Sequence, residues 1–163
     1  MNRIHLAIAA TCCAVAAVGT IAVWQMRPAQ AQEAFAGTWD VVDVRPAPWV
    51  GTNSSDKPYL NEAIARGRIT FMADSVQGPD FLNCDKAQYD IAKVPPEYLF
   101  QGGLTDPANQ ARELGFKGGE ILQMSMSCIA GDADIGMDFD LIDEDVAVFA
   151  LDNMIYKMHR VKP

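Results

Sequence analysis

The sequence predicts a mainly β fold, a small antiparallel barrel of about seven or eight short strands with one short helix. The first observation behind this prediction is an apolar–polar alternation with a period of two in the C-terminal half of the chain. The second is that turn-forming residues separate short apolar runs throughout. Because closing a sheet removes its exposed edges, we expect a barrel rather than an open sheet.

The first predicted strands are short and bounded by residues that break a ladder. A strand is expected over residues 39–44, where the following prolines end it. Residues 49–61 contain glycine, serine, asparagine and proline and predict a long surface loop. Strands are expected again over residues 68–72 and 87–91, with a turn at Gly78-Pro79-Asp80.

The predicted helix lies in the connection that follows, at Pro107–Leu114. Asp106 stands at the N-cap position, Pro107 at the first helical position, and Gly115 just past the end. The pattern predicts two turns of helix at most.

The C-terminal half shows the alternation most clearly. One predicted strand places four apolar residues on a single face, namely Leu122, Met124, Met126 and Cys128. In the next strand, apolar residues alternate with Asp138 and Asp140, which we expect on the solvated face. Turn residues at 143–145 and 152–153 indicate that this strand begins a three-stranded meander.

Residues 1–31 are typical of a secretory signal peptide. Arg3 precedes an uncharged stretch from Leu6 to Trp24, and Ala29-Gln30-Ala31 has the small-x-small pattern of a cleavage site. Cleavage after Ala31 would release a periplasmic or secreted protein. The uncharged stretch also approaches the length of a membrane span, so an uncleaved inner-membrane anchor through residues 6–26 remains an alternative.

Residues 32–163 are expected to form a single exported barrel domain. Without residues 1–31 the chain loses Arg3 and Arg27 and no acid, which leaves 11 basic and 21 acidic side chains and a net charge of −10. Such a charge repels nucleic acid and anionic membranes. We therefore expect neither nucleic-acid binding nor membrane insertion after cleavage.

Two cysteines, Cys84 and Cys128, follow the signal. In an oxidising compartment they predict a disulfide. The alternative is a pair of free thiols used for redox chemistry or metal binding, but neither cysteine belongs to a C-x-x-C motif.

The start of the first strand resembles a known signature. Phe35-Ala36-Gly37-Thr38-Trp39 is similar to the Gly-x-Trp signature of lipocalin-like barrels. The resemblance implies that Trp39 closes one end of the barrel and that a basic residue of the last strand, Arg160, packs across it.

The chain also resembles the META-type domains of small bacterial envelope proteins. The matching motifs are Gly37-Thr38-Trp39, Ile69-Thr70-Phe71 and Val76-Gln77-Gly78, followed by Cys84. The sequence departs from the family at Leu82-Asn83-Cys84, where the family has Gly-Cys-Asn. The resemblance implies a fold and an envelope location more than an activity.

Catalytic and metal-binding patterns are sparse. His159 is the only histidine after residue 31, which excludes a site of several histidines within one chain, and no nucleophile-elbow motif surrounds a serine. The run Asp132-Ala133-Asp134-Ile135-Gly136 begins like a calcium loop but lacks the closing glutamate. We expect no cofactor, no metal and no enzymatic activity.

The methionines and aromatic residues give the remaining candidates. Met124 and Met126 could bind Cu(I), but their place on the apolar face favours a core or a ligand cavity. Residues 95–104 carry Tyr98, Leu99 and Phe100, which we interpret as a lid over the open end of the barrel, with a partner-binding loop as the alternative. Trp49 is expected at the same rim.

These observations predict an exported, non-enzymatic periplasmic binding or envelope-maintenance protein, whose partner is a small apolar ligand or another envelope protein. An acidic inhibitor or immunity-type protein that binds a basic secreted enzyme, such as a lysozyme, is the alternative. An open cavity would favour the first function and a filled core beneath an acidic rim the second. The cavity is expected to be lined by Leu122, Met124, Met126, Phe139 and Tyr156.

Overall fold

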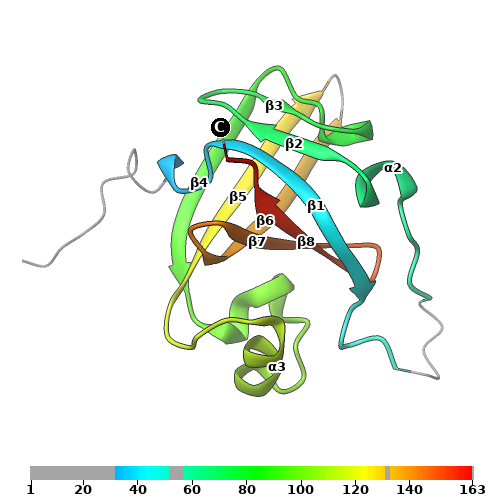
Figure 1. Ribbon diagram of the computed structural model, residues 1–163, viewed down its shortest axis with the longest axis vertical. Helices are drawn as coiled ribbons and strands as arrows, with labels where there is room; N and C mark the ends of the chain where they lie inside the picture. The colour runs from blue at the N-terminus through cyan, green and yellow to red at the C-terminus, as the bar shows by residue number, and fades with distance from the viewer. Residues whose placement is uncertain (1–31, 52–56, 131–132, 163) are drawn as a thin grey trace, which may run out of the picture.

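The computed structural model describes residues 32–51, 57–130 and 133–162. Within these residues, eight strands form one antiparallel sheet in the order β3-β2-β1-β8-β7-β6-β5-β4. The sheet curls into a nearly closed barrel, which confirms the predicted fold class (Figure 1). The strands are β1 Gly37–Pro46, β2 Arg68–Phe71, β3 Val76–Gln77, β4 Ala87–Val94, β5 Ile121–Ala130, β6 Ala133–Asp143, β7 Val146–Leu151 and β8 Met154–Arg160.

The first and last strands are neighbours in the middle of the sheet. β1 pairs with β8 from Trp39 opposite Arg160 to Pro46 opposite Met154, with a bulge between Val41 and Asp43. The strand is therefore longer than the predicted residues 39–44. Pro46 occupies its last position, where the absence of a backbone N–H interrupts no further ladder.

The barrel closes at a seam between its two edge strands, β3 and β4. Val76 pairs with Cys84, and the backbone N–H of Ala87 donates to the carbonyl of Asp74 at 2.7 Å. A disulfide joins Cys84 to Cys128 of β5, which confirms the predicted bond. The seam is thus held by a few local bonds and a covalent link instead of a continuous ladder.

The predicted helix is present as α3, Pro107–Leu114. It ends at Gly115 in the left-handed conformation, with φ of 107°. Asp106 occupies the N-cap position, but its carboxylate accepts from the Asn109 side chain instead of a backbone N–H. A second short helix, α2 Glu62–Ala65, was not predicted. Its N-cap Asn61 accepts from two backbone N–H groups.

The predicted meander is formed by β6, β7 and β8. The β7–β8 turn has Asp152 and Asn153 at φ of 50° and 62°. Asparagine and aspartate tolerate this conformation better than most residues, and two such residues match the twist of a tight hairpin.

The barrel interior is filled by apolar side chains. Phe149 stacks on Tyr156 at 4.9 Å between ring centroids, and Phe139 meets Phe71 edge to face at the same distance. The predicted inner face of β5 is confirmed, because Met124, Met126 and Cys128 are buried there. The largest fully buried side chains of this interior are Trp39, Tyr156, Phe35, Phe139, Phe149, Ile64, Ile69, Leu82, Met124 and Met126.

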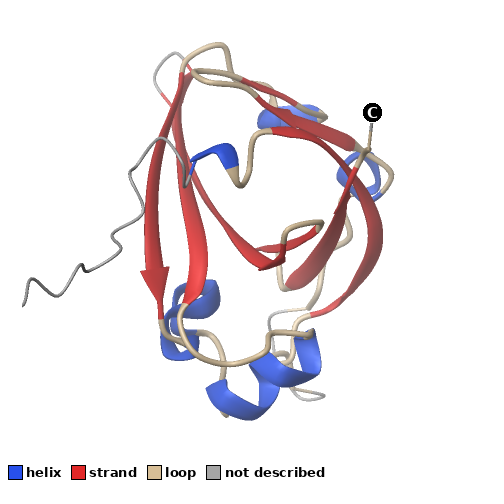
Figure 2. Ribbon diagram, turned by 60° about the vertical axis from the view of Figure 1, so that its left-hand side comes forward, coloured by secondary structure: helices blue, strands red, loops and turns tan. Residues whose placement is uncertain are grey.

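A second apolar cluster lies outside the barrel wall. The connection from β4 to β5 contains η2 Pro96–Gly102 and α3, and it packs on outward-facing residues Ile121, Val148 and Ile155. Figure 2 shows the strands as a ring with this connection outside it. The segment is therefore a cover for the outer wall, and the predicted lid over the open end is wrong.

Among the described residues, no helix is long and apolar enough to cross a membrane. The predicted signal or anchor, residues 1–31, lies outside the described part of the chain. Most of the predicted loop over residues 49–61 is described, except residues 52–56.

Candidate functional site: an apolar cavity at one end of the barrel

Arg160 and Trp39 meet at the end of the barrel where the described chain begins. The Arg160 guanidinium carbon lies 4.1 Å from the centre of the Trp39 ring, which confirms the predicted contact. Gly37 has φ of 110°, and a Cβ there would lie 3.4 Å from the guanidinium. A Cβ at that distance would make ordinary contact, so glycine is favoured here by its backbone conformation.

Arg160 also holds the segment before β1, residues 34–36. Its guanidinium donates to the carbonyls of Ala34 and Ala36, and its Nε donates to the carbonyl of Glu144 at 2.9 Å. The Trp39 indole N–H donates to the carbonyl of Phe35 at 2.8 Å. These bonds fix Phe35, which is fully buried, as a plug in the barrel end.

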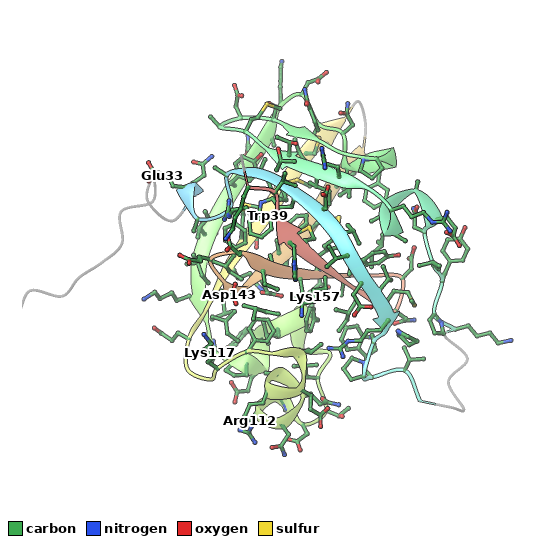
Figure 3. The ribbon with its side chains drawn as sticks, in the orientation of Figure 1. Glu33, Trp39, Arg112, Lys117, Asp143 and Lys157 are labelled. Carbon is green, nitrogen blue, oxygen red and sulfur yellow. A yellow bond between two sulfur atoms is a disulfide. The ribbon has the colours of Figure 1, made fainter. Side chains whose placement is uncertain are left out.

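An apolar cavity of about 270 Å³ opens beside this plug. We call it the end cavity. Figure 3 labels Glu33 on the N-terminal turn and Trp39 on β1, near this end. The lining residues come from the N-terminal segment, β2, the β2–β3 turn, β4 and β5, namely Gln32, Glu33, Phe35, Ala36, Phe71, Met72, Ala73, Tyr89 and Met124.

Three polar side chains border the end cavity; Glu33 is exposed at its edge, and the other two, Gln32 and Tyr89, are engaged in structural bonds. The Gln32 side chain donates to the carbonyl of Ala73 at 2.9 Å, and the Tyr89 hydroxyl donates to the carbonyl of Ser75 at 2.8 Å. Burial, with a further contribution from Asp74, raises the pKa of Tyr89 to about 12. Tyr89 is therefore neutral at physiological pH and offers the cavity an apolar ring.

The end cavity does not continue into the barrel. Met124, Met126, Phe139 and Tyr156 are at most 1 % exposed, so the residues expected to line an open calyx instead fill it. Of these four residues, only Met124 borders the end cavity. A ligand at this site is therefore held at the barrel end.

The predicted rim residues do not all converge on one site. Leu99 and Phe100 are buried in the cluster outside the wall, whereas Tyr98 is 66 % exposed. Trp49 packs against Phe100, with 5.6 Å between ring centroids, and its indole N–H donates to Asn153 at 2.9 Å. Met126 is buried in the barrel core, whereas Trp49 and Phe100 belong to the cluster outside the wall.

Asp140 overturns the prediction of a solvated face on β6. It faces outward, as its alternation with Phe139 requires, yet it is fully buried. One carboxylate oxygen accepts from the Gln123 amide at 2.8 Å, and the other has no hydrogen-bond partner. Burial raises the pKa of Asp140 to about 7, opposed by the Gln123 bond and reinforced by nearby Asp138.

The remaining chemical candidates lie on the surface. His159 is exposed on β8, and the Ser125 hydroxyl donates to Asp138 at 2.6 Å on the outer wall. In the described ranges, no group of three or more histidine, cysteine, aspartate or glutamate side chains could hold a metal ion. Asp132, the first residue of the calcium-like run, lies outside those ranges.

Comparisons with models of protein families, with curated proteins and with solved structures find no match to this chain.

Proposed function

We propose that this protein is an exported, non-enzymatic binding protein of the bacterial envelope, which holds a small apolar ligand in the end cavity. The observation that carries the proposal is the apolar lining of that cavity, with the rings of Phe35, Phe71 and Tyr89 and the thioethers of Met72 and Met124. Burial of apolar surface is the principal driving force for binding at such a site.

The size of the end cavity limits the ligand. Pockets for drug-sized molecules begin at about 300 Å³, and this cavity has about 270 Å³. The flexible methionine side chains can adapt to ligands of different shape. The proposed ligand is therefore one short alkyl chain, or the end of a longer one.

The test is calorimetric titration of the exported protein with n-alkanols of increasing chain length. Each additional buried methylene should raise the affinity about fourfold until the cavity is full. Ala73→Trp should abolish binding, because Ala73 is exposed and borders the cavity, so a large ring there fills the site without disturbing the core.

The matched control is Ala92→Trp, which places the same ring at an exposed position of β4 outside the cavity. This variant should bind the alkanols as the unmodified protein does. Absence of binding for the whole series, or equal binding by Ala73→Trp, would overturn the proposal.

The filled barrel interior favours a second candidate, an acidic protein that binds a basic secreted enzyme through its surface. Residues 32–163 carry a net charge of −10, which would steer a basic partner. Titration with a lysozyme at low and high salt tests this candidate. A salt-sensitive complex that inhibits the enzyme would support it, and absence of a complex at low salt would exclude that partner.

A further inference from the structure

A second groove, which shares Tyr89 with the end cavity, crosses the outer face of the barrel wall. Two adjoining hollows of about 380 and 360 Å³ share Gln101, Gly136, Met137 and Asp138. The first extends to Trp49 and Asp152, and the second extends across β5 to Asp90 on β4. We call the two hollows together the outer groove.

One side of the outer groove is an aromatic wall. The rings of Trp49 and Phe100 lie 5.6 Å apart and are tilted by 41°. Trp49 is fixed by its bond to Asn153 and by close contact with Gly103, where a Cβ would lie 3.2 Å from the indole ring. The wall is therefore preorganised. Phe100 is buried, so the half-buried Trp49 ring is the one that can attract a cation through its face.

The groove also has a single sign of charge. Asp90, Asp138 and Asp152 line it, and none of the described residues lining either hollow is lysine or arginine. The local field therefore favours a cation over an anion or a neutral ligand.

The carboxylates are spaced along the groove instead of gathered at one point. Asp90 pairs with Ser125, which pairs with Asp138, so the two acids lie two strands apart. Adjacent strands are about 4.8 Å apart, which places these acids on the order of 10 Å from each other. One metal ion needs its ligands within about 2.6 Å, so this spacing does not suit it.

We propose that the outer groove binds a linear aliphatic polyamine. Its ammonium groups would pair with Asp90, Asp138 and Asp152, and its methylene chain would pack on Trp49 and Phe100. A flexible chain of ammonium groups matches both the spacing of the acids and the apolar wall beside them. The proposal is independent of the function proposed for the end cavity.

The test is titration of the exported protein with spermidine by calorimetry, with putrescine and Mg²⁺ as separate ligands. Spermidine should bind most tightly, because it has the largest number of ammonium groups to pair with the acids. Asp138→Asn should weaken binding about tenfold. Asn at this position keeps an oxygen that can accept from the Ser125 hydroxyl.

Two further variants separate the groove from the general surface charge. Asp90→Asn changes an exposed position, so it should weaken the binding of spermidine by a similar factor without affecting folding. Asp143→Asn removes the same charge at an exposed position outside the groove and should change the affinity less than twofold. Ala73→Trp in the end cavity should leave spermidine binding intact.

Equal effects of Asp138→Asn and Asp143→Asn would overturn the proposal, because they would indicate attraction to the net charge alone. Mg²⁺ binding as tight as that of putrescine would also overturn it, because Mg²⁺ has the same charge without the methylene chain. Absence of spermidine binding at low salt would likewise overturn the proposal.

Discussion

Asp140 allows the sharpest test of the packing outside the barrel wall. The substitution is Asp140→Asn, which replaces a buried carboxyl group by an amide of nearly the same shape that cannot ionise. The amide oxygen can accept the existing bond from Gln123. Its NH₂ group takes the position of the carboxylate oxygen that has no partner.

The expected magnitude follows from the pKa of this carboxyl group. Burial raises its pKa from 3.8 to about 7 in the folded protein. The folded state therefore keeps a proton over a pH range in which the unfolded chain has lost it. As a result, the free energy of unfolding falls as the pH rises from about 4 to about 7, by about 4 kcal/mol in total, and stays low above that range.

The assay is chemical denaturation of the oxidised protein at pH about 4 and about 8.5. From the lower to the higher pH, the free energy of unfolding of the unmodified protein should fall by about 4 kcal/mol more than that of Asp140→Asn. Asp143→Asn, at an exposed position of the same strand, should behave as the unmodified protein does. If Asp140→Asn shows the same pH dependence as the unmodified protein, Asp140 does not carry the titration and the reasoning is refuted.

Two other predictions concern the bonds that hold the barrel. Replacing Cys84 and Cys128 by alanine should lower the free energy of unfolding by about 4 kcal/mol, because the disulfide joins residues 44 positions apart. Denaturation of both forms measures this loss, and a change below about 1 kcal/mol would contradict it. Arg160→Lys keeps a charge near Trp39, but lysine cannot donate to three carbonyls in the same geometry. This substitution should therefore lower the free energy of unfolding by about 1–3 kcal/mol. Limited proteolysis should then cut residues 32–36 faster, and unchanged protection would show that Arg160 does not hold this segment.

The inner face of the barrel was predictable from the sequence because burial acts on every second residue. Met124 and Met126 are two positions apart on one strand, so their side chains point to the same face, and both are buried inside the barrel as predicted. The disulfide was predictable from the two cysteines that follow the predicted signal, on the expectation that the chain is exported. The contact of Arg160 with Trp39 came from a resemblance in short motifs and is present in the structure.

The outer face was less predictable because alternation shows which way a side chain points, and not what covers it. Asp140 points outward as predicted, yet it is fully buried, opposite Val148 of the apolar cluster outside the wall. Leu99 and Phe100 pack in the apolar cluster outside the wall. From the sequence alone, such a cover cannot be distinguished from a lid over the barrel end. β3, with two residues, is too short to show a period.

The end cavity was predicted only in part. Met124 was a candidate, whereas Phe35, Met72 and Tyr89 were assigned to strands or to the signature without a role at a site. These residues come from segments far apart in the chain. Only the closure of the barrel at the seam brings them together, and no local pattern encodes that closure.

The pairing of β1 with β8 also sets the order in which this chain can fold. Arg160 bonds to Ala36 across 124 positions of sequence, so the wall cannot be completed until the last strand is available. Contacts of such long range make folding slow, because the loop must close before the pairing compensates for the lost entropy. Until then one side of β1 is an unpaired edge. The charges of Asp40, Asp43 and Arg45 along β1 disfavour pairing of that edge with another chain during this interval.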